Sequence, residues 1–181
     1  LQSQMRASQM KISSADRLRS GAVQTFIPSD HISQKLLNFL LKQCPLGNSI
    51  WHGREHWIRV LQNGRMLAQL TGANLKVVEL FALIHDCRRE NEDEDLEHGF
   101  KSGDFAKTLQ GKWFHLADDE LTDLVYACHW HSHGKTIAST TIMTCWDSDR
   151  LDLGRVGIRP SPKYLCTDAA KQEDVIQKCY A

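Results

Sequence analysis

The chain reads Val77-Val78-Glu79-Leu80-Phe81-Ala82-Leu83-Ile84-His85-Asp86 near its middle, and this run decides the fold. Its apolar residues have the composition of a buried helix. The helix ends in an imidazole followed by a carboxylate. Because burial of two such groups is costly unless they are compensated, we expect a ligand at this point. A divalent cation is the simplest candidate.

Helical patterns flank this run on both sides, so the chain is predicted to be all-α. No convincing pair of strands and no internal repeat interrupts the patterns. Ser29 or Asp30 is expected to cap the first helix. Helices are expected over residues 31–43, 53–70, 75–86, 99–109, 118–128, 140–153 and 168–180.

The length of 181 residues suits a single domain. Residues 1–28 are polar and weakly patterned, and we expect them to form an N-terminal tail or arm. Residues 29–181 are expected to form the helical domain, with residues 160–181 as a C-terminal extension. The charge-dense stretch from Arg88 to Glu97 is expected to be a solvated loop.

Composition argues against several classes of function. Lys and Arg together number 22, as do Asp and Glu, so the zero net charge gives no support to nucleic-acid binding. No window approaches the roughly 18 apolar residues of a membrane span, and no signal peptide is visible. We therefore expect a cytoplasmic protein with no membrane partner. The oligomeric state stays open.

The six cysteines are scattered without a Cys-x-x-Cys pair, which argues against a zinc–cysteine site. Their even number permits disulfides. We nevertheless expect reduced, buried thiols, because several of them lie inside apolar helical patterns. They are Cys44, Cys87, Cys128, Cys145, Cys166 and Cys179.

Four residues in a fixed order resemble the signature of a known superfamily. His56 precedes Ile-Arg-Val at the start of one predicted helix, His85-Asp86 ends the next, and Asp147 lies on a late helix. This order resembles the H…HD…D signature of the HD-domain metal-dependent phosphohydrolases, over about residues 50–160. The resemblance implies an HD-domain helical bundle. The stretch Asp147-Ser148-Asp149-Arg150-Leu151-Asp152 is similar to a subgroup of small HD proteins, and that likeness places the metal on Asp147.

The resemblance implies a divalent cation held by His56, His85, Asp86 and Asp147. Two neutral imidazoles and two carboxylates balance its charge, so the site can be buried. These ligand types do not select among Mn, Mg, Fe, Co, Ni and Zn. In binuclear HD enzymes, extra histidines hold a second metal. His98 and His131 occupy comparable places in this chain, and their other expected role is to bind phosphate or to donate a proton.

By the same resemblance, the expected reaction is hydrolysis of a phosphate ester by metal-activated water. The expected substrate is a nucleotide or nucleotide-like phosphomonoester, ahead of a phosphodiester. Asp86 would bridge the metal and the water, and His98 or His131 would protonate the leaving oxygen. Arginine binds phosphate through two parallel hydrogen bonds. The candidate substrate-binding residues are therefore Arg88, Arg89 and Arg150.

The remaining histidines are expected to have lesser roles. His52 lies four residues before His56, and we interpret it as a helix-start residue or a support for His56. His129 and His133 are interpreted as surface residues.

Two alternatives stay open. An HD-type di-iron oxygenase would need six ligands, with His98 and His131 among them. A non-catalytic domain could instead bind a nucleotide and regulate a partner, although the intact H…HD…D set argues against a degenerate site.

Overall fold

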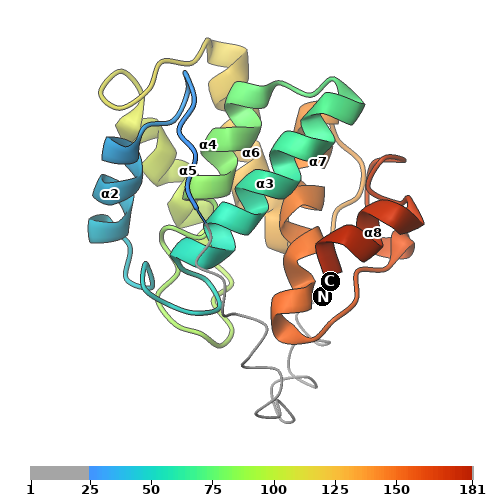
Figure 1. The fold of residues 1–181 in the computed structure, drawn as a ribbon. Coiled ribbons are helices and arrows are strands. Elements are labelled where there is room, and N and C mark those ends of the chain that lie inside the picture. Colours follow the sequence, from blue (N-terminus) through green and yellow to red (C-terminus); the bar gives the residue numbers. More distant parts are fainter. Residues whose placement is uncertain (1–24, 181) are drawn as a thin grey trace.

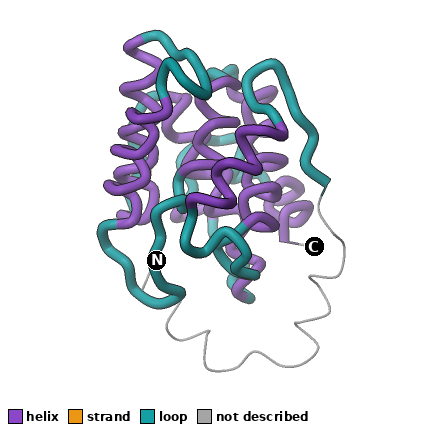
Figure 2. The backbone as a smooth tube through the Cα atoms, turned by 90° about the vertical axis from the view of Figure 1, so that its left-hand side faces the viewer, coloured by secondary structure: helices purple, strands orange, loops and turns teal. Residues whose placement is uncertain are grey.

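The computed structural model describes residues 25–180, so most of the predicted tail of residues 1–28 lies outside the described residues. Over the described range the regular structure is helical, apart from one isolated bridge between Gln110 and Phe114 (Figure 2). The prediction of an all-α fold is confirmed. The α-helices, labelled as in Figure 1, are α2 (Gln34–Gln43), α3 (Arg54–Thr71), α4 (Leu75–Ile84), α5 (His98–Leu109), α6 (Asp118–Trp130), α7 (Thr140–Arg150) and α8 (Glu173–Tyr180). Short 3₁₀ helices are η3 (His131–His133), η4 (Leu151–Val156) and η5 (Pro162–Tyr164).

The first helix begins later than the sequence predicts. Its N-cap is Ser33, whose hydroxyl accepts the N–H of Leu36, so neither Ser29 nor Asp30 caps it. The last helix also begins later, at Glu173, because residues 168–171 form a turn.

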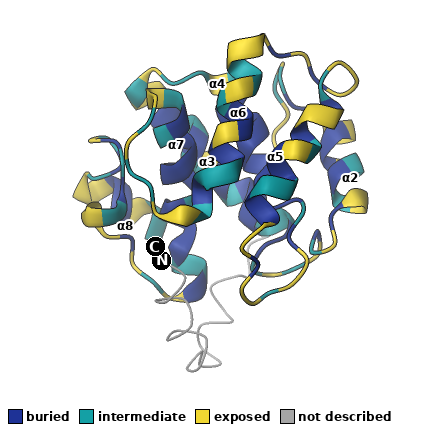
Figure 3. Cartoon of the chain, turned by 180° about the vertical axis from the view of Figure 1, so that it is seen from behind, coloured by how far each residue is buried: buried dark blue, intermediate teal, exposed yellow. Residues whose placement is uncertain are grey.

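Helix α4 is the centre of the bundle, and every residue from Val77 to Ile84 is buried. It packs against α3, α6 and α7, and Figure 3 shows the buried residues along the inner faces of the helices. Gly64 lets α3 approach α4 closely, since a Cβ there would lie 2.6 Å from Cγ1 of Val78. The end of α4 is therefore rigidly placed within the core.

Glu79 is a buried carboxylate on α4, and Arg65 compensates its charge while Ser29 adds a hydrogen bond. Arg65 of α3 donates from Nε to Oε1 at 2.6 Å, and the Ser29 hydroxyl donates to Oε2 at 2.5 Å. Arg65 also donates to the carbonyl of Ile27. These bonds tie the segment before α2 to the central helices and satisfy a group that would otherwise be costly to bury.

Cys44 and Cys87 form a disulfide, with their Cα atoms 4.9 Å apart. The expectation of reduced thiols was therefore wrong for this pair. Cys44 follows α2 and Cys87 follows the His85-Asp86 pair, and the bundle brings these two points together. Cys128 and Cys145 are free and buried, as expected, and burial raises the pKa of both thiols.

The charged stretch between α4 and α5 is less solvated than the sequence predicts, because two of its charged residues are buried. Arg89 donates from Nε to the carbonyl of Asn91 and from Nη2 to that of Asp93. The carboxylate of Asp95 accepts the backbone N–H groups of Glu90 and Glu97. Arg89 and Asp95 thus fold the loop into a compact structure. In the described part of the chain, no helix is both long enough and apolar enough to cross a membrane.

Candidate metal centre

Helix ends converge at one point beside α4. The start of α3 supplies His56, the turn after α4 supplies His85 and Asp86, and the start of α5 supplies His98. His131 follows α6 directly, and Asp149 lies in the last turn of α7. The histidines of this cluster are all buried.

The imidazoles of His56 and His85 form the first pair, with their Nε2 atoms 3.1 Å apart. Nδ1 of His56 lies 2.6 Å from Oδ2 of Asp152, and Nδ1 of His85 lies 3.2 Å from the carbonyl of Phe81. Both partners are acceptors, so each Nδ1 carries the proton and each neutral imidazole has its lone pair on Nε2. Two lone pairs that face each other do not form a hydrogen bond, but they do suit a cation between them.

His98 and His131 form a second pair of the same kind, with Nε2 atoms 2.9 Å apart. Nδ1 of His98 donates to the carbonyl of Asp95, and Nδ1 of His131 donates to that of Cys128 at 2.7 Å. Their Nε2 atoms therefore also present lone pairs.

Asp86 lies between the two pairs. Its Oδ1 is 3.2 Å from Nε2 of His98 and 3.4 Å from that of His131. Its Oδ2 is 3.7 Å from Nε2 of His56 and 3.8 Å from that of His85. One carboxylate oxygen thus faces each pair, which is the arrangement of a bridging ligand.

Asp149 completes the first pair. Its Oδ1 is 3.4 Å from Nε2 of His56 and 3.7 Å from that of His85. The ligand atoms of His56, His85 and Asp149 lie close enough together to hold one ion, as do those of His85, Asp86 and His131. The donor set therefore fits one or two divalent cations.

The protonation states also suit a cation. Burial, together with the charge of Arg155, lowers the pKa of His56 to about 4, so this imidazole is neutral at neutral pH. Burial alone would raise the pKa of Asp149, but the neighbouring His85 and His56 outweigh it and hold the pKa at about 2.

Asp147, the predicted metal ligand, is not part of the cluster. Its carboxylate accepts the N–H of Cys166 at 2.7 Å and both the N–H and the hydroxyl of Thr167, at 2.8 and 2.7 Å. Residues two apart on a helix point about 200° apart. Only one of Asp147 and Asp149 can therefore face the histidines, and in this structure it is Asp149.

The three arginines predicted to bind substrate donate to backbone carbonyls. Arg88 stacks over the ring of Phe105, 3.7 Å from its centroid, and donates to the carbonyl of Gln43. Arg150 is buried and donates to the carbonyls of Lys135 and Tyr164. Arg89 folds the loop described above. The structure therefore gives each of the three a role in holding the chain together.

His52 has a more specific environment than its sequence position indicated. It is buried, and its Nδ1 lies 2.7 Å from Oε2 of Glu92. Its ring meets that of His56 edge-on, with centroids 6.4 Å apart, and no described residue bonds its Nε2. Burial lowers the pKa of His52, and this effect exceeds that of the Asp86 charge, which would raise it. The i, i+4 spacing placed His52 beside His56, but nothing in the sequence pointed to Glu92 as its partner.

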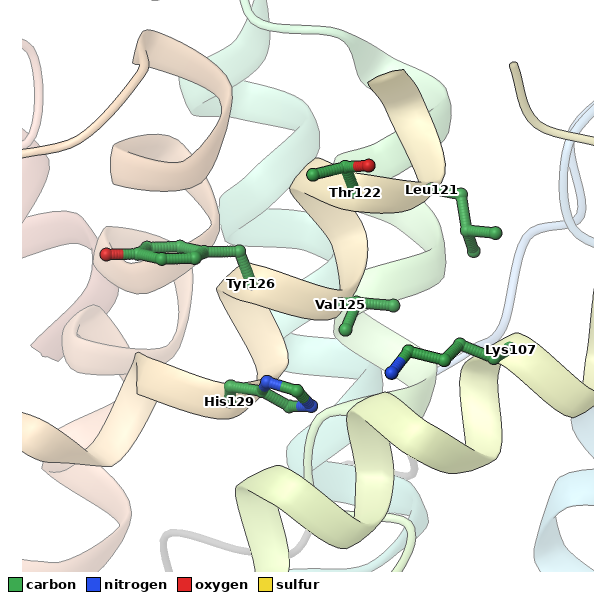
Figure 4. A pocket seen from close by; sticks show the side chains of 6 residues that line it. All are labelled: Lys107, Leu121, Thr122, Val125, Tyr126 and His129. Carbon is green, nitrogen blue, oxygen red and sulfur yellow. The ribbon is translucent and has the colours of Figure 1, made fainter. Parts of the chain in front are cut away.

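A separate groove of about 330 Å³ lies on the outer face of α5 and α6 (Figure 4). None of its lining residues belongs to the histidine cluster. They are Lys107, Leu121, Thr122, Val125, Tyr126 and His129.

No family model and no curated protein matches the chain. Its structure is similar to the crystal structure of a predicted HD superfamily hydrolase from an uncultured Thermotogales bacterium, with a TM-score of 0.62 and 21% sequence identity. The match covers 81% of this chain and 84% of that one. At this identity the likeness concerns the fold. The chain therefore has the helical fold of the HD superfamily.

Proposed function

We propose that this chain is a phosphohydrolase that uses two divalent cations to cleave a small phosphate ester. The observation that carries the proposal is the convergence of four Nε2 lone pairs, in two facing pairs, on either side of Asp86. The proposed ligands are His56, His85 and Asp149 for one cation, His98 and His131 for the other, and Asp86 for both. Asp149 replaces Asp147 in this set.

Charge supports a phosphate substrate. Asp86 and Asp149 bring two negative charges, so two divalent cations leave the centre with a net positive charge. A phosphomonoester is close to dianionic at neutral pH, and it suits this centre better than a singly charged diester. Bound cations would supply a hydroxide at neutral pH and stabilise the charge that develops on phosphorus. A nucleotide-like monoester remains within this proposal.

His98 and His131 are poor proton donors in this geometry, since their Nδ1–H groups bond carbonyls and leave Nε2 without a proton. We assign the proton transfer to His52. The carboxylate of Glu92 accepts its Nδ1–H and orients the ring, so the basic atom is Nε2, which would take a proton from the attacking water.

The test starts from chain purified with Mn²⁺ or Co²⁺, with its metal content measured by elemental analysis. Phosphate release is then screened over a panel of phosphomonoesters and diesters. We expect two cations per chain and release from a monoester, with both lost in His85→Ala and Asp86→Ala. The exposed Asp168 provides a control, Asp168→Asn, which should match the wild type. Equal turnover by all four proteins would defeat the proposal.

The same six ligands favour one second candidate, a di-iron oxygenase. Its mark would be two irons per chain, with near-ultraviolet charge-transfer absorption and oxygen consumption. Hydrolysis by the Mn²⁺ form and no oxygen consumption by the Fe form would exclude it.

A further inference from the structure

The four imidazoles of the centre differ in what orients them. Three donate Nδ1–H to backbone carbonyls, and these are His85, His98 and His131. His56 alone donates to a side chain, the carboxylate of Asp152. A carboxylate partner increases the basicity of a ligating imidazole and fixes its ring. His56 is therefore equipped as a stronger metal ligand than the other three.

Asp152 is held in place by two arginines. Arg59 donates from Nε to Oδ1 at 2.7 Å and from Nη2 to Oδ2 at 3.2 Å. Nη1 of Arg155 lies 3.9 Å from Oδ2, and the Nε of Arg155 donates to the carbonyl of Trp51 at 2.9 Å. The carboxylate is thus a fixed acceptor for the Nδ1–H of His56.

From this contrast, and on the basis of the proposed two-cation centre, we infer that Asp152 makes the two cation sites unequal. It is a positioning residue that gives the site of His56, His85 and Asp149 the higher affinity, so this site fills first. The second site, with His98 and His131, has only carbonyl-supported imidazoles.

Each of the three aspartates in the stretch Asp147-Ser148-Asp149-Arg150-Leu151-Asp152 then has a different role. Asp147 binds the segment at Cys166 and Thr167, and Asp149 faces the imidazole pair. Asp152 lies in η4, which bends the chain back toward the start of α3, and from there it reaches Nδ1 of His56.

The experiment is a calorimetric titration of metal-free chain with Co²⁺, followed in parallel by the visible absorption of the ion. We expect two binding steps in the wild type. Asp152→Asn should weaken the tighter step by about 10–100-fold, because the neutral amide neither matches two arginines nor supports His56, and should leave the weaker step unchanged. Asp168→Asn should leave both steps unchanged. An Asp152→Asn protein that binds like the wild type, or that loses both steps equally, would overturn the inference.

A second measurement needs no variant. Nitrogen-15 NMR of the metal-free wild type should show His56 neutral, with its proton on Nδ1, and a proton on Nε2 instead would refute the role of Asp152. The two proposals fail separately. If the two sites bind Co²⁺ unequally but no phosphate ester is hydrolysed, the proposed phosphohydrolase activity is wrong. If the chain hydrolyses a phosphate ester but Asp152→Asn leaves the Co²⁺ titration unchanged, only the inference about Asp152 is wrong.

Discussion

The Nε2 atoms of His56 and His85 face each other at 3.1 Å, although neither has a proton to give the other. The two rings are fully buried, so bulk water does not reach this contact. A cation between them would remove a repulsion that the metal-free chain has to bear.

Metal should therefore stabilise the fold. A saturating cation, at about 100 times its dissociation constant, adds about 2.7 kcal/mol to the free energy of unfolding. We expect Mn²⁺ to raise the melting temperature by several degrees, measured by calorimetry with and without EDTA. The shift should disappear in His85→Ala. If Mn²⁺ does not change the melting temperature of the wild type, the proposal of a metal centre is wrong.

Asp147 and Asp149 should respond oppositely to replacement. Asp147→Asn disturbs three hydrogen bonds to Cys166 and Thr167, and should lower the free energy of unfolding by about 1–3 kcal/mol while metal still binds. Asp149→Asn should lose metal affinity with little loss of stability of the metal-free chain. Urea unfolding and Mn²⁺ titration of both variants measure this. The reverse pattern would restore Asp147 as the ligand.

Glu120 should make the free energy of unfolding depend on pH in the acid range. Hydrogen bonds from Asn74 and from the N–H of Ala117, together with Lys76, lower its pKa from 4.5 to about 2. A lowered pKa stabilises the fold above about pH 4.5, and that stabilisation is lost as the pH falls toward 2. At neutral pH, Glu120→Gln should cost about 1 kcal/mol, and the difference from the wild type should vanish near pH 2. Urea unfolding across this range tests it, and a constant difference would contradict it.

The disulfide between Cys44 and Cys87 closes a loop of 43 residues in sequence. Cross-links of this kind add about 2–4 kcal/mol to the free energy of unfolding. We expect dithiothreitol to lower wild-type stability by that amount, measured by urea unfolding. Cys44→Ala should be less stable from the outset and insensitive to the reductant. A wild type that is equally stable in both conditions would show that the bond contributes nothing.

Within the proposed function, His52 should affect turnover and not metal content. His52→Gln should lower kcat by about 10²–10⁴-fold, the usual contribution of a positioned general base. Glu92→Gln should lower it less, because the ring remains. Elemental analysis should show unchanged metal in both variants. Loss of metal together with activity would make His52 a support for His56 alone.

The sequence was sufficient for the helical fold and for the residues carried by its strongest pattern. His85 and Asp86 end an apolar run whose burial can be read directly, and the order of residues pointed to His56. The choice between Asp147 and Asp149 depends on the rotation of α7, which its weak apolar pattern does not determine. The partners of Arg150 depend on the path of the irregular segment near Tyr164. The Cys44–Cys87 bond depends on packing between elements that are distant in the sequence.

Arg89 determines the conformation of the loop between α4 and α5. By gathering the carbonyls of Asn91 and Asp93, it sets the path of the chain between Asp86 and His98, and Glu92 on that path holds His52. An inserted or deleted residue here would displace Glu92 and His98, and with Glu92 the partner of His52. The stretch that the sequence suggests is an ordinary hydrophilic linker therefore has a length that the centre constrains.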